Sequence, residues 1–192
     1  QSDLNVVVMV LVTDAYSNTG GQMSKATPMG MDTPFAPGGK NAGRYPLGMS
    51  VAHGGHTYVA QVNLAFPNHL ISAFKKAAEY KGPSLLLCYV PCMTEQKFPE
   101  ELVADQARKA TTTRYWPLWD YDPVTDTWNV DSNKDRTKRV AKFEGNYIDD
   151  FCRFEGRFRS QFDKDGNPSG LMLGQAEDNL KVWDQLRKNA GI

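Results

Sequence analysis

Long apolar runs separated by polar loops predict an α/β fold. The first run, "NVVVMVLVT" at residues 5–13, is continuously apolar and β-branched, which is typical of a strand covered on both faces in a parallel sheet. Shorter runs of the same kind at residues 56–65 and 84–90 predict two further strands. We therefore expect a mostly parallel sheet with flanking helices, and we expect that other parts of a larger assembly complete this sheet.

Two helices are predicted between and after these strands. Pro67 opens a helix over residues 67–80 whose apolar positions recur at helical spacing, and Gly82 with Pro83 ends it. A second, amphipathic helix is expected from Glu100 to Thr113. The order strand, helix, strand is that of a parallel α/β unit.

The pattern changes near residue 120. We predict a hairpin or loop over residues 122–135, a helical patch over 147–162 and a final helix over 175–189. Residues 1–120 are thus expected to form an α/β domain. Residues 121–192 are expected to form an irregular, partly helical extension that packs on this domain or on a neighbouring subunit.

Composition and charge exclude some classes of function. The 192 residues hold 22 basic and 22 acidic side chains, so no net field favours nucleic acid or an anionic membrane. The longest apolar stretch is far shorter than a membrane span, and the start lacks a signal-peptide pattern. Three cysteines argue for a reducing, cytoplasmic setting, although the matrix of an anaerobic organelle also fits. Because the chain begins with Gln1, we expect a processed piece, a split subunit or a fragment.

The loop after the first strand is the main candidate for chemistry. In open α/β sheets, ligands lie beyond the carboxyl ends of the strands. Thr13 offers a hydroxyl there, Asn18 offers an amide, and Gly20 with Gly21 allows a close approach of the backbone. Such oxygens suit Mg²⁺ shared with a diphosphate, but a simple polar connector fits the same pattern. The segment from Gly20 to Met49 lacks any period and is a candidate lid or binding loop.

The stretch "AYSNTGGQMSKATP" closely resembles the signature of the pyruvate:ferredoxin (flavodoxin) oxidoreductase family, and the similarity continues through "YVAQV" and "GPSLLLCYVPC". The resemblance is to the thiamine-diphosphate domain of the single-chain enzymes, and implies half of a thiamine-diphosphate-binding fold. It implies that Thr13 binds Mg²⁺ through its hydroxyl, that Ala15 binds it through its carbonyl, and that Asn18 is catalytic and faces the thiazolium. The residues that it assigns to the cofactor are Thr13, Asp14, Ala15, Tyr16, Ser17, Asn18, Thr19 and Gly20.

The family's metal motif has an upstream Gly-Asp-Gly half that this sequence lacks. The resemblance therefore implies that the matching carboxylate comes from sequence before Gln1 or from another chain. It also implies that Cys92 is one ligand of a 4Fe-4S cluster whose other three cysteines lie outside this sequence. We interpret Cys88 as a core residue and Cys152 as structural or incidental.

Other motifs favour plain structural roles. His53 and His56 are better read as loop histidines than as a zinc site, since zinc needs more ligands. The Gly-Gly-Lys at 38–40 lacks the rest of a nucleotide P-loop. Residues 163–170, "DKDGNPSG", are predicted to form an Asp-Gly turn rather than a calcium loop, and the aromatic residues of 114–121 to pack at an interface.

The resemblance implies thiamine-dependent oxidative decarboxylation of a 2-oxo acid, with pyruvate favoured, or the reverse synthase reaction. Coenzyme A would take the acyl group, and electrons would pass through Fe-S clusters to ferredoxin or flavodoxin. The implied partners are the remaining domains or subunits, in a dimer of the whole assembly. Two alternatives stay open: a thiamine-dependent decarboxylase or synthase without iron, and a noncatalytic structural subunit that keeps the fold.

Overall fold

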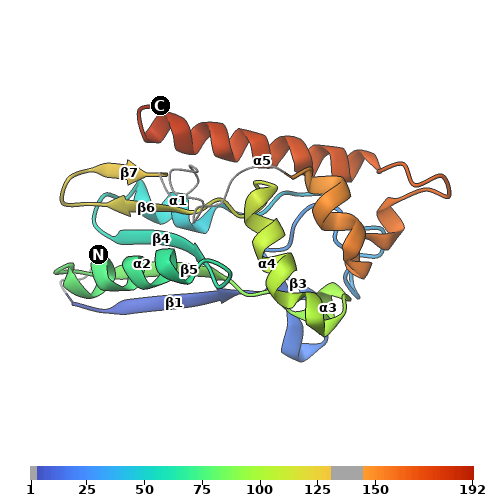
Figure 1. The fold of residues 1–192 in the computed structure, drawn as a ribbon, viewed down its shortest axis with the longest axis horizontal. Coiled ribbons are helices and arrows are strands. Elements are labelled where there is room, and N and C mark those ends of the chain that lie inside the picture. Colours follow the sequence, from blue (N-terminus) through green and yellow to red (C-terminus); the bar gives the residue numbers. More distant parts are fainter. Residues whose placement is uncertain (1–3, 131–144) are drawn as a thin grey trace.

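A computed structural model describes residues 4–130 and 145–192. Its main sheet has the strand order β1-β5-β4-β6-β7 (Figure 1). Strands β1 (Val7–Val12), β5 (Ser84–Tyr89) and β4 (Tyr58–Asn63) run parallel. The hairpin of β6 (Trp119–Asp122) and β7 (Thr127–Asn129) joins antiparallel beside β4. The predicted α/β class, with a mostly parallel sheet and flanking helices, is confirmed.

Helix α2 (Pro67–Glu79) covers one face of β4 and β5. Its small residues Ala73 and Ala77 face the sheet and pack with Leu86 and Cys88, which lets the helix approach closely. Pro67 occupies the first turn, where its missing N–H costs no hydrogen bond. The prediction of this helix is confirmed at both ends.

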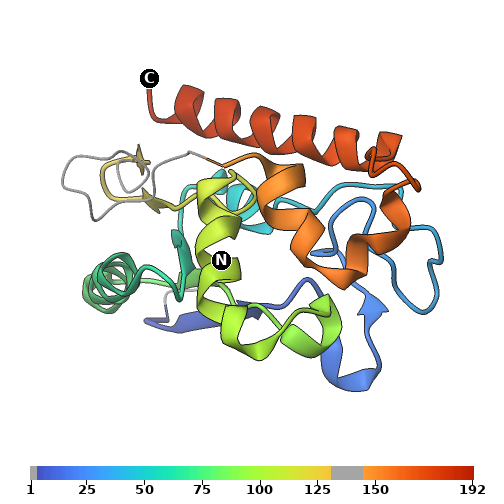
Figure 2. The ribbon, with the colours of Figure 1, turned by 45° about the vertical axis from the view of Figure 1, so that its right-hand side comes forward.

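The other face is covered by segments from both before and after β4 and β5. Helix α1 (Leu47–Ala52) and the final helix α5 (Gly170–Asn189) pack over it, together with the short helices η4 (Tyr147–Phe151), η5 (Cys152–Phe154) and η6 (Gly156–Gln161). Figure 2 shows these short helices in orange beside α4 (Val103–Thr112) and below α5. Residues of the predicted extension therefore contribute to the same apolar cores as the sheet. That they form a separate extension stays a prediction.

Smaller elements surround the carboxyl end of β1. Strands β2 (Ala15–Tyr16) and β3 (Gln22–Met23) form a two-stranded hairpin around η1 (Ser17–Thr19). Helix α3 (Met93–Gln96) follows β5, and η2 (Glu100–Leu102) leads into α4. Among the described residues, no helix is both long and apolar enough to cross a membrane.

The prediction that the first strand is covered on both faces is wrong for the described residues. β1 is an edge strand, and Val8 and Leu11 are 48% and 60% exposed. The apolar run correctly predicted a strand, but no described element lies beyond its free edge. The expectation that further sequence completes this sheet stays a prediction.

Two other boundaries differ from the sequence prediction. Helix α1 begins inside the stretch from Gly20 to Met49, which we expected to be without regular structure. Helix α5 begins at Gly170, five positions before the predicted residue 175, because the Ser169 side chain accepts a hydrogen bond from Met172 N and caps it.

The predicted hairpin is present as β6 and β7, and residues 131–135 of that prediction lie outside the described residues. β6 crosses residue 120, where we predict the end of the domain, so the extension begins within the sheet. The division at this residue stays a prediction.

Aromatic residues form much of the contact between the sheet and the extension. The ring of Tyr115 lies 5.9 Å from that of Tyr89 on β5, 5.5 Å from Tyr147 and 4.8 Å from Phe151. Trp116 is also buried, and its indole N–H donates to Val62 O at 2.8 Å. The aromatic stretch thus packs an interface inside the chain.

Candidate functional site

The ends of β1 and β5 form one edge of the sheet. Val12 pairs with Tyr89, and Val90 N donates to Val12 O at 3.0 Å. The segment that begins at Thr13 and the segment that contains Cys92 therefore leave the sheet side by side. Loops at the carboxyl ends of parallel strands are the usual place for ligands in such folds.

The turn after β1 brings two oxygen atoms together. Thr13 Oγ1 donates to Ala15 O at 3.0 Å, and Ser17 Oγ donates to the same carbonyl at 3.4 Å. Neighbouring oxygen ligands of an octahedral Mg²⁺ lie about 2.9 Å apart, because each lies about 2.0–2.1 Å from the metal. The Thr13 and Ala15 oxygens fit one edge of such a coordination shell.

Two glycines end this turn. Gly20 and Gly21 have φ values of 113° and 79°, a region that glycine enters without a steric cost. A side chain on Gly21 would meet the Glu95 carboxylate, which is the end of a flexible side chain and can move aside. The positive φ of Gly21 is therefore the main reason for glycine at this position.

Three of the predicted cofactor residues are accessible. Tyr16, Asn18 and Thr19 have exposed side chains, and Thr19 Oγ1 donates to Gln22 Oε1 at 2.5 Å. Asn18 lies in the middle of η1, at the outer surface of the turn. Its amide is thus open to a ligand at this edge.

The side chain of Asp14, unlike those of Tyr16, Asn18 and Thr19, is buried. The φ of Asp14 is 70°, and its carboxylate points into the protein. Asp14 Oδ2 accepts hydrogen bonds from Arg157 Nη1 and Tyr115 OH, both at 2.8 Å, and Oδ1 accepts one from Arg44 Nη2 at 3.0 Å. Both carboxylate oxygens are thus bonded to interior side chains and do not point to the surface of the turn.

A buried charge cluster surrounds this carboxylate. We define it as Asp14, Arg44, Glu155 and Arg157, two acids and two bases. Arg157 Nε donates to Glu155 Oε2 at 2.6 Å, and the side chains of both residues are fully buried. Opposite charges and hydrogen bonds are what allow ionised groups to be buried.

The electrostatics of the charge cluster are strongly perturbed. Burial raises the pKa of Glu155 to about 7, although Arg157 and Gln106 act to lower it. Burial acts to lower the pKa of Arg157, but Glu155 and Asp14 outweigh this effect and raise it well above its usual value. The two guanidinium groups therefore stay charged.

Cys92 follows β5 at the same edge of the sheet. It is half-buried, and its carbonyl accepts the first hydrogen bond of α3 from Gln96 N at 2.8 Å. Within residues 4–130 and 145–192, no group of three or more His, Cys, Asp and Glu side chains could hold a metal ion. Any cluster bound here would need ligands beyond the described residues.

The other two cysteines are core residues. Cys88 and Cys152 are fully buried, and burial raises the pKa of the Cys88 thiol to about 11. The Cys152 thiol has a pKa raised well above its usual value by burial. The predicted packing role of Cys88 is confirmed, as is the structural reading of Cys152.

The remaining motifs have local partners. His53 Nδ1 lies 2.7 Å from Met49 O, and Lys40 Nζ donates to Thr27 O at 2.7 Å. Asp163 Oδ1 accepts hydrogen bonds from the backbone N–H groups of Asp165 and Asn167, which forms the predicted Asp-Gly turn. Each motif therefore stabilises its own loop.

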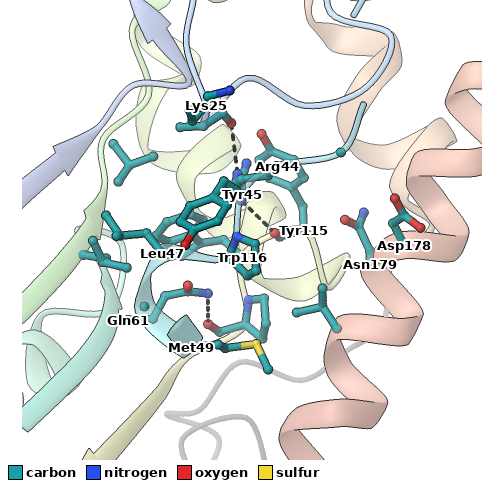
Figure 3. A pocket seen from close by; sticks show the side chains of 18 of the residues that line it. Lys25, Arg44, Tyr45, Leu47, Met49, Gln61, Tyr115, Trp116, Asp178 and Asn179 are labelled. Atoms are coloured by element: carbon teal, nitrogen blue, oxygen red, sulfur yellow. Dashed lines mark hydrogen bonds between the residues drawn. The ribbon is translucent and has the colours of Figure 1, made fainter. Parts of the chain in front are cut away.

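A cavity of about 400 Å³ opens between β1, residues 43–49 and α5. Figure 3 shows Tyr45, Leu47 and Met49 on one side of it and Asn179 of α5 on the other. Its walls are mainly apolar, and Lys25, Arg44 and Lys181 are among the charged side chains that line it. The expectation that a cofactor binds at the turn after β1 stays a prediction.

Comparisons with known proteins agree with the signature. No protein-family profile matches the chain. Over all of the chain, it is 34% identical to a pyruvate-flavodoxin oxidoreductase of Rhodospirillum rubrum, of which it covers 16%. Over 62% of the chain, it is 48% identical to a probable pyruvate-flavodoxin oxidoreductase of Escherichia coli, of which it covers 10%.

The chain covers a larger share of a shorter relative. The chain is 28% identical to the ketoisovalerate oxidoreductase subunit VorB of Pyrococcus furiosus, over 98% of this chain and 58% of that subunit. The chain is thus related to oxidoreductases that act on 2-oxo acids. More particularly, by sequence it is a relative of the pyruvate:ferredoxin (flavodoxin) oxidoreductases, and it spans a small part of their length.

The sequence did not point to the charge cluster. Arg157 and Asp14 are 143 positions apart, and no spacing rule joins them. One usable signal exists, because Glu155 and Arg157 stand between the aromatic residues Phe154 and Phe158 in "FEGRF". Charges in such an apolar stretch are expected to be paired when they are buried.

Proposed function

We propose that this chain contributes the Mg²⁺-diphosphate turn and one iron-sulfur ligand to a 2-oxo acid oxidoreductase, with pyruvate as the favoured substrate. The overall reaction converts a 2-oxo acid and coenzyme A to acyl-CoA and CO₂, releases a proton and passes two electrons to ferredoxin or flavodoxin. The same catalyst can run the reverse synthase reaction. We also propose that the remaining domains or subunits complete the enzyme in the cytoplasm, as a dimer of the whole assembly.

The observation that carries this proposal is the pairing of two features at one sheet edge. The Thr13 and Ala15 oxygens lie 3.0 Å apart at the end of β1, and Cys92 follows the adjacent strand β5. A relative named pyruvate-flavodoxin oxidoreductase aligns over all of the chain and so over both segments. This supports a thiamine diphosphate and an iron-sulfur cluster bound near each other.

Each residue has a defined part in the proposal. Thiamine diphosphate, when bound, supplies the carbanion that attacks the ketone of the 2-oxo acid. The Thr13 hydroxyl and the Ala15 carbonyl hold the metal, and Asn18 donates a hydrogen bond near the reacting carbon. The Cys92 thiolate ligates a 4Fe-4S cluster with ligands from outside the described residues.

Steady-state assays of the native assembly that contains this chain test the proposal. We expect pyruvate-dependent and coenzyme A-dependent reduction of methyl viologen, and loss of at least tenfold in rate with Thr13→Val. Thr125→Val, at the exposed β6-β7 turn, is the matched control and should keep the wild-type rate. If no 2-oxo acid supports reduction, or if the two threonine variants behave alike, the proposal is wrong.

A further inference from the structure

We infer that Arg157, in the C-terminal extension, is a positioning residue for the metal-binding turn and acts on it through Asp14. This inference rests on the proposed function, because it concerns the Thr13 and Ala15 oxygens. Asp14 stands between these two residues, so any movement of its backbone changes the spacing of both oxygens.

The backbone of Asp14 needs support from its surroundings. A φ of 70° is uncommon for residues other than glycine, and such conformations persist where neighbouring groups hold them. Here the carboxylate is held by Arg157, Tyr115 and Arg44. The carbonyl of Asp14 accepts hydrogen bonds from Ser24 Oγ at 3.1 Å and Thr27 Oγ1 at 2.5 Å.

Arg157 is itself held by the extension and by α4. Its Nε donates to Glu155 at 2.6 Å, and Gln106 Nε2 of α4 donates to Glu155 Oε1 at 3.1 Å. Gly156 N donates to Lys97 O at 3.0 Å, which ties the same stretch to the end of α3. A continuous path of buried hydrogen bonds therefore runs from α4 through the extension to the turn.

The charge balance makes Arg157 hard to replace. The charge cluster holds two carboxylates and two guanidinium groups, and Arg157 bonds to both carboxylates. Without it, Glu155 loses the guanidinium that bonds it, and among the residues that the structure describes Asp14 keeps only Arg44 as a cationic partner. A buried charge that has lost its partner is costly, so the structure around Asp14 should rearrange.

The effect should be seen first in metal affinity. Partners that orient metal ligands from outside the coordination shell typically change affinity by about 10–100-fold when they are removed. The probe is Mg²⁺, titrated by calorimetry into the native assembly in the presence of thiamine diphosphate. We expect Arg157→Gln to weaken Mg²⁺ binding by about 10–100-fold, and Arg157→Lys, which keeps a charge without the planar fork, by less.

The matched control is Asp120→Asn on β6. Asp120 is another buried carboxylate in an ion pair, 2.7 Å from Lys76, and it lies outside the charge cluster. This variant should lower the thermal midpoint without changing Mg²⁺ affinity. If Arg157→Gln does not fold, Gln106→Met, which removes the hydrogen bond from α4 to Glu155, tests the same path and should also weaken Mg²⁺ binding.

The outcomes separate the two claims. If the wild-type assembly binds Mg²⁺ with thiamine diphosphate but the Arg157 variants bind Mg²⁺ equally well, the positioning role is wrong and the proposed function stands. Equal losses in the Arg157 variants and in Asp120→Asn also overturn it, because the effect is then general destabilisation. A wild-type assembly that binds no thiamine diphosphate at any Mg²⁺ concentration overturns the proposed function and this inference with it.

Discussion

Asp14 combines a left-handed backbone with a buried charge at one position. Its φ is 70°, and both of its carboxylate oxygens are engaged in the interior. The sequence assigned it to the cofactor only because it lies within the signature stretch. Its carboxylate is bonded in the interior, and we propose a supporting part for it, while the oxygens of Thr13 and Ala15 on either side lie 3.0 Å apart.

Glu155 should make stability depend on pH. Its pKa is about 7 in the folded protein against an ordinary value of 4.5, so the folded state holds a proton that the unfolded chain releases. Between these values the free energy of unfolding should fall as the pH rises, by at most about 1.4 kcal/mol per pH unit, and should then level off above pH 7. Thermal midpoints measured from pH 4.5 to pH 8 check this.

Glu155→Gln provides the comparison for this prediction. The variant cannot ionise at this position, so its thermal midpoint should change less between pH 4.5 and pH 7 than that of the wild type. Parallel profiles for the two proteins would show that other groups cause the pH dependence.

Cys92 should be required for iron but not for thiamine diphosphate. Cys92→Ser removes the proposed thiolate ligand, so we expect the native assembly to lose iron and acid-labile sulfide while it keeps thiamine diphosphate. Cys88→Ala is the control, since that thiol is fully buried in the core beside α2. Iron retained in Cys92→Ser, or lost equally in both variants, would contradict the assignment.

At the scale of elements, local sequence signals predicted β4, α2 and β5 well. Pro67 and the Gly82-Pro83 pair mark the limits of α2, and continuous apolar runs mark β4 and β5 on either side of it. These elements are fixed by short-range sequence, so their bounds were predicted to within two residues.

Elements held by distant contacts were harder to predict. Helix α1 has six residues and no side-chain cap, and its burial comes from packing beside Trp119 and Val59. The charge cluster joins the turn after β1 to η6, far apart in the sequence. Tertiary packing decides such features, and a single sequence shows little trace of them.

The cap of α5 gives a prediction at this scale. The Ser169 hydroxyl accepts from Met172 N and donates to Gln161 Oε1 at 2.7 Å. Ser169→Ala should lower the free energy of unfolding by about 1 kcal/mol, measured by urea denaturation, and Ser169→Asp should retain the cap. The exposed Ser72→Ala within α2 is the control, and an equal effect of the two alanine variants would argue against the cap.

At the scale of the whole molecule, the free edge of β1 implies a neighbour. Val8 and Leu11 are apolar side chains left 48% and 60% exposed on β1, whose outer edge pairs with no other strand within residues 4–130 and 145–192, and natural sheets usually protect such edges. The chain covers only 16% of its Rhodospirillum rubrum relative, so much of that protein lies outside it. We predict slow hydrogen exchange for residues 7–12 in the native assembly.

Charged substitutions provide the matching test. Leu11→Lys should impair the assembly or lower its thermal midpoint, because it places a charge on a surface that we expect to be covered. Val124→Lys is the control, since Val124 is 77% exposed at the β6-β7 turn. Rapid exchange over β1 together with a harmless Leu11→Lys would show that this edge faces solvent.

The cofactor content of the native assembly tests the central claim most directly. We would measure magnesium, thiamine diphosphate, iron and acid-labile sulfide per copy of this chain, with every partner retained. The proposed oxidoreductase requires thiamine diphosphate with magnesium, and iron with sulfide. Thiamine diphosphate without iron would indicate a decarboxylase or synthase, and the absence of both would show that the chain keeps the fold without the chemistry.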